Sequence, residues 1–426
     1  MLLVLSFVFF MLLGLPLFGV IGLASIISMI GMPFPMEFIP QNLYTGMDQF
    51  PLIATIGFVM AGFLMEPAGI TGEIIEVAKK AVGNIRGGLA MVTILACMIF
   101  AALSGSGPAT TAAIGSIMIP GMIAAGYRKD DAAAVSATGG TLGILIPPSN
   151  PMIIYGVVAN TSIAGLFMAG FIPGFVLTSL MCITAYCIAK KRGYQGTNEK
   201  FSIVGLCKAI WDGKWALATP AIILGGIYAG IFTPTEAAVV AIFYTILVGI
   251  FIHKELTLKS FMASLKTTSW LTGRVLVLVF TATAFGYLLT SYRIPVEIAN
   301  WILSFTNNVN LVWFFVVILL LFLGMFMETL AIIMLVTPVL LPIMTAYGVD
   351  PIHFGIILIC CCGIGFSTPP LGENMFIASG IANISLEEIS LKALPLVAIN
   401  IAVIAILVMF PDIVLFLPNL MGTGLQ

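Results

Sequence analysis

The chain has 426 residues, of which 60% are hydrophobic and only 8% are charged, and its formal net charge is −1. Soluble domains carry roughly 25% charged residues, so this composition predicts an integral membrane protein. The near-zero net charge excludes a general attraction to nucleic acid, and the presence of only two histidines excludes most histidine-based metal and triad chemistry.

The first apolar stretch covers residues 2–30, and we predict one tilted transmembrane helix there because the stretch is too short for two spans. The loop that follows, through Gln49, contains no Lys or Arg and is predicted to be periplasmic. The next span is predicted over 50–66. An amphipathic helix over 71–82 is then expected to lie in the cytoplasmic interface rather than to cross the membrane.

Two apolar segments within 87–127 are separated by Ser-Gly-Ser-Gly-Pro at 104–108, which cannot continue a helix. Each half is short for a full crossing and cations flank both ends, so we predict a re-entrant helical hairpin. The next helix, within 131–160, is interrupted by Ile-Pro-Pro-Ser-Asn-Pro at 146–151 and is predicted to be broken in its middle. A long span over 162–189 then ends at a cationic cluster.

Residues 215–252 are predicted to form a plain two-helix hairpin. Its turn, Thr-Pro-Thr-Glu at 233–236, has the sequence of a capping box with Pro at the first helical position. Lys214 and Lys254 flank the hairpin, which indicates that both of its ends are cytoplasmic.

The second half of the chain repeats the helix breaks of the first half at a nearly constant spacing. Gly143 recurs as Gly365 (365 − 143 = 222), and the Pro-Pro pair at 147–148 recurs at 369–370 with the same offset. Paired breaks at a fixed offset predict an internal repeat. The first repeat begins outside, whereas the second follows the cationic loop 253–274 and begins inside, so the repeats are predicted to be inverted.

Inverted repeats that carry broken helices are typical of secondary transporters. Non-helical backbone at membrane depth is costly unless it lines a cavity or binds a ligand. We therefore expect the four predicted breaks to converge: 104–108, 147–151, 324–328 and 368–372.

The charge map makes a testable prediction about topology. A reporter fused after Arg192 or Lys259 should read cytoplasmic, and one fused after Gln49, Asp350 or the C-terminus should read periplasmic. Sixteen of the 17 Lys and Arg residues fall on the cytoplasmic side of this topology, with Arg293 as the exception. A cytoplasmic C-terminus would contradict the inverted repeat.

Three stretches resemble the large membrane subunit of TRAP transporters, the tripartite ATP-independent periplasmic transporters: SGSGPATTAAIGSIMIPGM (104–122), TGGTLGILIPPSNPMIIYG (138–156) and GIGFSTPPLGENMFIASGIAN (363–383). The resemblance extends over essentially the whole chain. It implies an all-α, elevator-type secondary transporter of the bacterial inner membrane, with a scaffold, amphipathic arm helices and a mobile transport domain. It also implies two partners, a separate small four-helix membrane subunit and a periplasmic substrate-binding protein.

The resemblance and the predicted elements together divide the chain into six segments. They are the N-terminal transmembrane helix and periplasmic loop of the scaffold (1–49), a scaffold helix and the cytoplasmic arm helix (50–86), repeat 1 of the transport domain (87–192), cytoplasmic loops and the scaffold helical hairpin (193–271), a scaffold helix and the periplasmic arm helix (272–310), and repeat 2 with the C-terminal helix (311–426).

Transporters that resemble this chain bind sodium where a hairpin tip meets the broken helix beside it, because unwound backbone supplies hard carbonyl oxygens. The resemblance implies two sodium sites and no organic cofactor. The first site would use Ser104, Ser106, Gly143, Ile146 and Pro148, and the second would use Gly324, Gly365, Thr368 and Leu371. The two hairpin tips differ in sequence, so the hairpin ligands of the second site stay open.

Substrates of the family are small organic anions, usually carboxylates. No cation lies at the predicted midplane, so the substrate is expected to be held by half-helix N-termini, by sodium, and by the side chains of Ser104, Ser106, Thr110, Ser149 and Asn150. Glu328 and Asn374 are further candidates. The Glu328 carboxylate either binds a hydroxyl or ammonium group of the substrate or only caps its own helix, and Glu373 has the same two interpretations.

Overall likeness favours sialic acid (N-acetylneuraminate) as the substrate, with C4-dicarboxylates as the alternative. A second alternative is a stand-alone dimeric sodium–carboxylate symporter, which would transport free substrate without a binding protein. An enzyme is disfavoured because an intramembrane hydrolase needs a buried nucleophile with a base, and neither histidine fits. A channel is disfavoured because it needs no hairpin tips that meet from both sides.

Overall fold

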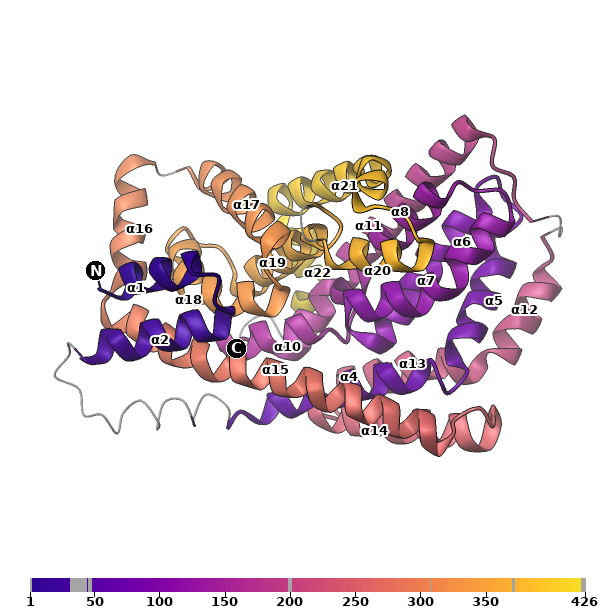
Figure 1. Cartoon of the computed structure of the whole chain (residues 1–426), viewed down its shortest axis with the longest axis horizontal. Coiled ribbons are helices and arrows are strands. Elements are labelled where there is room, and N and C mark those ends of the chain that lie inside the picture. Colours follow the sequence, from indigo (N-terminus) through magenta and orange to yellow (C-terminus); the bar gives the residue numbers. More distant parts are fainter. Residues whose placement is uncertain are drawn as a thin grey trace.

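The computed structural model describes residues 2–30, 44, 48–197, 201–306, 308–369 and 372–422, and every regular element in these ranges is a helix (Figure 1). Seven of these helices are long and apolar enough to cross a membrane, or up to nine spans if each of two bent helix pairs is counted as one. The prediction of an all-α, multi-pass membrane protein is confirmed.

The N-terminal stretch forms two helices, α1 (Leu2–Leu12) and α2 (Leu17–Ile30), so the prediction of a single helix over 2–30 is wrong. The break contains Gly14, which has a left-handed φ of +73°, and Pro16, which cannot continue a helix. The two helices pack against each other (Figure 1). At 1.5 Å per residue they are about 16 and 21 Å long, so each is shorter than the ~30 Å hydrocarbon core.

The first repeat contains the predicted arm helix, hairpin and broken helix. The arm helix leaves the preceding span at an angle of 73°, and the broken helix is bent by 42° at its break. In chain order the elements are α4 (Phe50–Met65), α5 (Ile70–Val82), α6 (Gly88–Ser104), α7 (Gly107–Ala124), α8 (Lys129–Gly139), α9 (Leu142–Leu145), α10 (Asn150–Val158) and α11 (Ile163–Arg192).

Between the repeats lie α12 (Ile203–Asp212), α13 (Lys214–Tyr228), α14 (Pro234–Leu247) and the π-helix η1 (Val248–Ile252). The predicted capping box is confirmed, because the Thr233 side chain accepts the Glu236 N–H at 3.3 Å while the Glu236 carboxylate accepts the Thr233 N–H at 2.8 Å. Helix α12 is an addition to the prediction, which assigns that stretch to cytoplasmic loops.

The second repeat has the same order of elements as the first, and its helices begin at the offset found in the sequence. This holds for α18 relative to α7 (329 − 107 = 222) and for α19 relative to α8 (351 − 129 = 222). The elements are α15 (Leu258–Ser291), α16 (Ile294–Phe305), α17 (Val309–Phe326), α18 (Thr329–Ala346), α19 (Pro351–Gly365), α20 (Glu373–Ala382), α21 (Leu386–Met409) and α22 (Pro411–Leu420).

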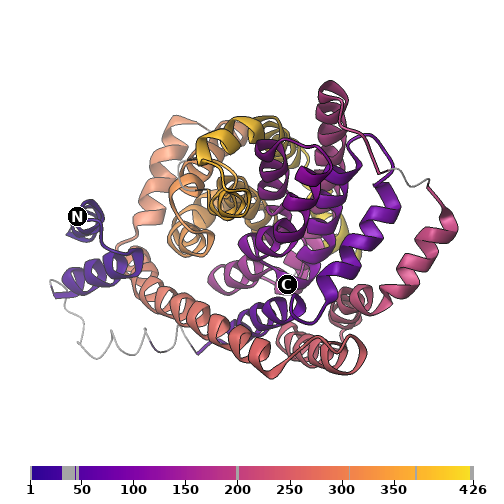
Figure 2. The same ribbon diagram turned by 45° about the vertical axis from the view of Figure 1, so that its right-hand side comes forward.

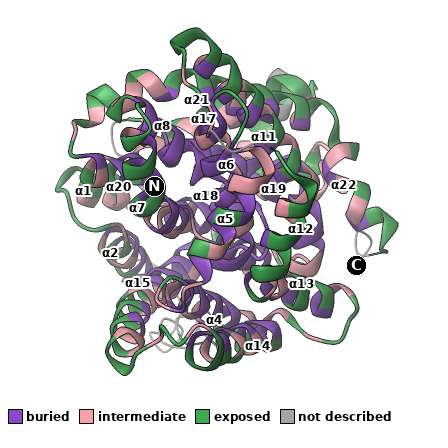
Figure 3. Cartoon of the chain, turned by 90° about the vertical axis from the view of Figure 1, so that its right-hand side faces the viewer, coloured by how far each residue is buried: buried purple, intermediate pink, exposed green. Residues whose placement is uncertain are grey.

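The broken helix of each repeat packs against the hairpin of the other repeat. Helix α10, the second half of the first broken helix, packs on α18 of the second hairpin, and its counterpart α20 packs on α7 of the first hairpin. Figure 2 shows the hairpins and broken helices of both repeats gathered in one body. Buried residues are concentrated in the centre of this body, around α6, α18 and α19 (Figure 3).

Helices α2, α15, α4 and α14 lie along one side of this body, each in contact with the next (Figure 1). Helix α15 has 34 residues and is about 51 Å long, so it exceeds the ~30 Å hydrocarbon core. The segment boundary predicted between residues 271 and 272 falls inside this continuous helix. Lys259, Lys266 and Arg274, which the prediction places in or next to a loop, therefore lie on α15 itself.

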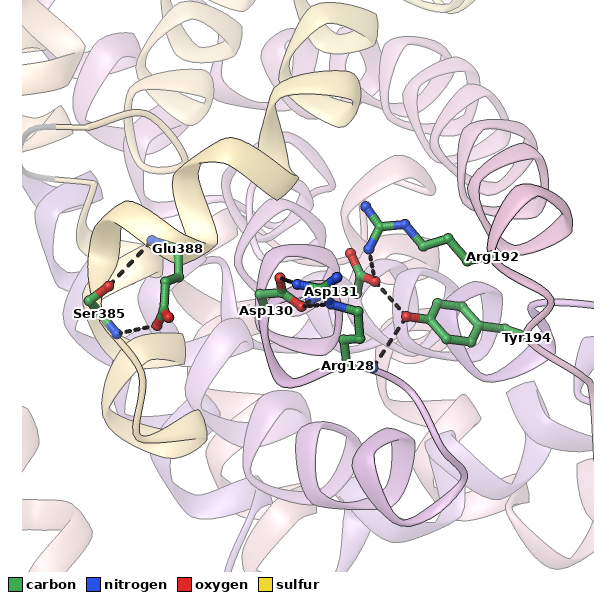
Figure 4. Close-up of polar contacts among 7 residues, drawn as sticks. All are labelled: Arg128, Asp130, Asp131, Arg192, Tyr194, Ser385 and Glu388. Atoms are coloured by element: carbon green, nitrogen blue, oxygen red, sulfur yellow. Dashed lines mark hydrogen bonds and ion pairs between the residues drawn. The ribbon is translucent and has the colours of Figure 1, made fainter.

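A cluster of polar contacts links the start of α8 to the end of α11 (Figure 4). Asp131, which is only 6% exposed, forms an ion pair with Arg192 and accepts a hydrogen bond from the Tyr194 hydroxyl at 2.6 Å. The Tyr194 hydroxyl accepts the backbone N–H of Arg128 at 3.2 Å, and its ring stacks on Tyr127 with centroids 4.1 Å apart. The cluster therefore joins the segment that follows the first hairpin to the end of α11.

We expect Asp131→Asn to lower the free energy of unfolding by about 1–3 kcal/mol, because it leaves a half-buried guanidinium without its counter-ion. Thermal unfolding in detergent measures this loss. The matched control is Asp130→Asn: Asp130 pairs with Arg128, whose side chain is 64% exposed, so the control should cost at most about 1 kcal/mol. Equal losses in the two variants would show that the cluster does not fasten the helices.

Candidate functional site

A cavity of about 300 Å³ lies where the tips of both hairpins meet the second halves of both broken helices. Arg274 of α15 borders it from the side of the long helices. A second pocket of about 300 Å³ adjoins the first and shares Arg274, Glu328, Phe366 and Glu373 with it. The predicted breaks converge, since residues of both tips and of the first break line one cavity together with Phe366 and Glu373 on either side of the second break.

Four helix N-termini open onto this cavity. Ser106 and Glu328 are the N-cap residues of α7 and α18, and Asn150 and Glu373 are the first residues of α10 and α20. All four residues line the cavity. Each helix N-terminus carries about +0.5 of an elementary charge and presents backbone N–H groups, which favours a small anion, although Glu328 and Glu373 already place carboxylates at two of the four. The sequence also predicted Glu328 and Glu373 at helix starts, and it left their roles open.

The first hairpin tip lies directly against the first break. The backbone N–H of Asn150 donates to the carbonyl of Gly105 at 3.2 Å. A β-carbon added to Gly143 would lie 2.6 Å from the Thr110 hydroxyl and would overlap the Ser106 carbonyl, so only glycine fits there. The structure thus brings Ser106 and Gly143 together, beside the break that contains Ile146 and Pro148.

The polar side chains predicted for the site in the first repeat fall into two groups. The hydroxyls of Ser104 and Thr110 are 2.9 Å apart, and that of Thr110 also donates to the Ser106 carbonyl at 2.8 Å. Ser149 is the N-cap of α10, where its hydroxyl accepts the Met152 N–H at 3.4 Å. These three side chains are buried and do not line the cavity, whereas Ser106 and Asn150 do.

The second hairpin tip meets the second break in an equivalent way. A β-carbon on Gly365 would lie 2.6 Å from the Cα atom of Gly324. The Thr368 hydroxyl donates to the Ile364 carbonyl at 2.7 Å, and the Asn374 amide donates to the Ala137 carbonyl at 3.1 Å without lining the cavity. The predicted ligand Leu371 lies outside the described residues.

The two asparagines at the starts of the second half-helices share an unusual feature. Both Asn150 and Asn374 are nearly inaccessible, and the side-chain oxygen of each has no hydrogen-bond partner among the described residues. Asn150 is the first residue of α10, and Asn374 is the second residue of α20. Because buried amide oxygens normally have a partner, these two oxygens fit a bound cation that uses neutral oxygen ligands.

Arg274 corrects the prediction that no cation lies beside the helix breaks. It lies well inside α15, about 24 Å along the helix from Leu258, and its Nη2 atom is 2.8 Å from Glu328 Oε2. The charge map groups Arg274 with the cytoplasmic cations because it places the start of this helix at residue 272. The missed signal is that an apolar run begins directly after Arg274, at Val275, with no turn residue between them.

The structure shows where the side chain of Glu328 points. Glu328 occupies the N-cap position of α18, but its side chain makes no capping hydrogen bond and points to Arg274 instead. It therefore forms no capping hydrogen bond to its own helix. Its carboxylate, which lines the cavity and is 23% exposed, remains available to contact a ligand.

Comparison with known proteins adds relatives in the same family. Residues 4–413 match the family model described as tripartite ATP-independent periplasmic transporter, DctM component. The chain is 42% identical to the isethionate TRAP transporter permease protein DctMQ of Oleidesulfovibrio alaskensis, over 96% of this chain and 65% of that protein. It therefore spans about two thirds of the length of that relative. It is 39% identical to the sialic acid TRAP transporter large permease protein SiaM of Vibrio cholerae, over 91% of each chain.

A further relative is the C4-dicarboxylate TRAP transporter large permease protein DctM of Rhodobacter capsulatus, 35% identical over 97% of each chain. Among solved structures, the YdaH transporter of Alcanivorax borkumensis has a similar fold, with a TM-score of 0.65 at 15% identity over 96% of this chain and 98% of that one. The family model, which matches nearly the whole chain, agrees with the three permease relatives. The chain belongs to the DctM family, the DctM component of the tripartite ATP-independent periplasmic transporters.

Proposed function

We propose that the chain carries out sodium-coupled uptake of a small organic anion across the bacterial inner membrane. The observation that carries this proposal is the convergence of four helix N-termini and Arg274 on one cavity between two broken helices. Arg274 and the helix N-termini attract an anion alongside the carboxylates of Glu328 and Glu373, and the breaks supply backbone oxygens for an ion. The hairpins and broken helices would move together as the transport domain of an elevator, against α15 and its neighbours.

The substrate class is a small organic carboxylate or sulfonate. The names of the relatives specify isethionate, sialic acid, C4-dicarboxylates and 2,3-diketo-L-gulonate. All of these are small anions, so their shared chemistry is what the cavity must recognise. N-acetylneuraminate, C4-dicarboxylates and isethionate are the first substrates to test.

Sodium would bind at two equivalent places, where each hairpin tip meets its break. The carbonyls around Gly143 and Gly365 supply neutral oxygen donors that suit sodium, and the unpartnered oxygen of Asn150 lies at the first break among the described residues. Sodium would supply positive charge next to the substrate. The sequence contains no GxxxxGK[ST] phosphate loop, which favours an ion gradient over ATP as the energy source.

Two protein partners and the lipid bilayer complete the proposed assembly. The partners are a small four-helix membrane subunit and a periplasmic binding protein that delivers the substrate to the periplasmic face, where the C-terminus would also lie. Large apolar side chains such as Phe243, Phe315 and Phe322 are exposed on α14 and α17. They suit contact with lipid or with the small subunit.

The test is uptake into proteoliposomes that contain the chain, the small subunit and the binding protein. Labelled isethionate, N-acetylneuraminate or succinate should accumulate under an inward sodium gradient and stop when potassium replaces sodium. Uptake at full rate in potassium, or a requirement for ATP, would contradict the proposal. Full uptake without the binding protein would instead support the stand-alone symporter.

A further inference from the structure

One cation and two carboxylates meet in the cavity. Arg274 comes from α15, Glu328 from the tip of the second hairpin, and Glu373 from the start of α20. Arg274 and Glu328 form the ion pair, with 2.8 Å between Nη2 and Oε2. An arginine halfway along an apolar helix is costly, so its presence in a cavity indicates a binding role or an essential counter-ion.

Arg274 has more hydrogen-bond donors than the ion pair with Glu328 uses. Its guanidinium has five N–H donors in a planar fork, and the contact with Glu328 joins one nitrogen to one oxygen. The side chain is 49% exposed although it lies in the middle of α15, and it borders both pockets. The Trp270 ring, 5.9 Å from the guanidinium carbon, lies on one side of the charge and also lines the main cavity. An anion in the cavity can therefore reach Arg274.

The position of Glu328 resembles that of a bound anionic group. Its carboxylate lies at the N-terminus of α18, next to the Arg274 guanidinium and inside the cavity that three other helix N-termini border. A carboxylate or sulfonate of a ligand would find its most favourable position at the same guanidinium, since arginine binds such groups with two parallel hydrogen bonds.

We propose that Arg274 binds the anionic group of the substrate and that Glu328 occupies its place until the substrate arrives. This inference rests on the proposed function and adds the residue that selects for negative charge. The exchange also has a structural consequence. The ion pair joins α15 to the tip of the second hairpin, so a substrate that takes Arg274 from Glu328 removes a direct link between the two.

The test measures anion affinity in variants that the exchange affects in opposite directions. The probes are isethionate, N-acetylneuraminate and succinate, each titrated in sodium chloride into the full chain in lipid nanodiscs, and the tightest of the three is used for all variants. Arg274→Gln should weaken its affinity roughly 10- to 100-fold, because a charge-assisted pair is lost. Arg274→Lys should restore part of the loss, since it keeps the charge without the fork. Glu328→Gln should strengthen binding, because the competing carboxylate is gone.

A matched control removes a cation from the same helix outside the cavity. Lys266 lies on α15, is exposed and does not line the cavity, so Lys266→Gln should leave the affinity unchanged. The double variant Arg274→Gln/Glu328→Gln carries neither charge of the pair and so avoids a single unpaired charge, which protects its folding. It should bind the anion as weakly as Arg274→Gln.

Three results would overturn the inference. The first is wild-type affinity in Arg274→Gln or in the double variant. The second is a loss in Glu328→Gln as large as that in Arg274→Gln, which would mean that Glu328 holds the ligand itself. The third is that none of the three anions binds the wild-type chain. If uptake did not need sodium but anion binding still depended on Arg274, only the proposed sodium coupling would be contradicted. The inference about Arg274 would be supported.

Discussion

Replacement of Gly143 or Gly365 by alanine is expected to reduce uptake at least about tenfold. Each glycine lies against the hairpin tip of its own repeat, and a β-carbon on either one would come within 2.6 Å of atoms at that tip. Overpacking of this kind typically costs about 1–3 kcal/mol of folding free energy. Here the strain falls on the contact between the hairpin tip and the helix break, beside the cavity. Uptake and anion affinity of each variant, measured in proteoliposomes, give the result.

The control is the same substitution at glycines with free space around them. A β-carbon on Gly121 of α7 or on Gly380 of α20 would have no neighbour within 4 Å among the described residues, and alanine favours a helix more than glycine does. Gly121→Ala and Gly380→Ala should therefore transport normally. If Gly143→Ala and Gly365→Ala matched these controls, the close contact between tip and break would have no role in transport.

The second large effect is expected at the unpartnered amide oxygens. Asn150→Ala removes an oxygen that has no hydrogen-bond donor among the described residues, so the folded chain should lose little stability. If that oxygen is a sodium ligand, the sodium concentration for half-maximal uptake should rise about tenfold, as in other ion sites that lose a supporting group. Asn374→Ala removes the second unpartnered oxygen, on a side chain whose amide donates to Ala137 of the first repeat, and should raise the sodium requirement in the same direction.

Asn400 of α21 provides the matched control for these variants. It is also a buried asparagine with unpartnered side-chain atoms among the described residues, but it lies away from the main cavity. Asn400→Ala should leave the sodium requirement unchanged. An unchanged requirement in Asn150→Ala and Asn374→Ala as well would remove both amides from the ion sites.

The helix breaks were predictable because their causes are local. Ser-Gly-Ser-Gly-Pro at 104–108 and the Pro-Pro pairs interrupt a helix in any surroundings, and the recurrence of the Pro-Pro break at a fixed offset predicts the same architecture twice. The capping box at Thr233 follows the same logic, since its hydrogen bonds join residues three positions apart.

The single helix predicted over 2–30 is wrong because the length of the apolar stretch was given more weight than the helix-breaking residues inside it. Gly14 and Pro16 are typical of a helix break, but the total length of 2–30 suggested a single span, on the assumption that every apolar helix crosses the membrane completely. The structure forms two short helices that pack on each other.

The composition of the site was less predictable because it depends on contacts between distant segments. The ion pair between Arg274 and Glu328 joins two different helices, and it requires the correct start of α15 and the correct position of the second hairpin tip. The sequence likewise could not separate Ser106, which lines the cavity, from Ser104 and Ser149, which do not. That difference depends on the rotation of each half-helix, which is set by packing.

Cooperative binding of sodium and an organic anion at one cavity is tested most directly by anion affinity in two salts. The full chain in lipid nanodiscs is titrated with isethionate, N-acetylneuraminate or succinate in sodium chloride and, in parallel, in potassium chloride. Sodium should lower the dissociation constant of the anion by about 5- to 150-fold. The anion should lower the dissociation constant of sodium by the same factor, because the coupling is reciprocal. Equal anion affinity in sodium and in potassium would contradict a shared, sodium-dependent site.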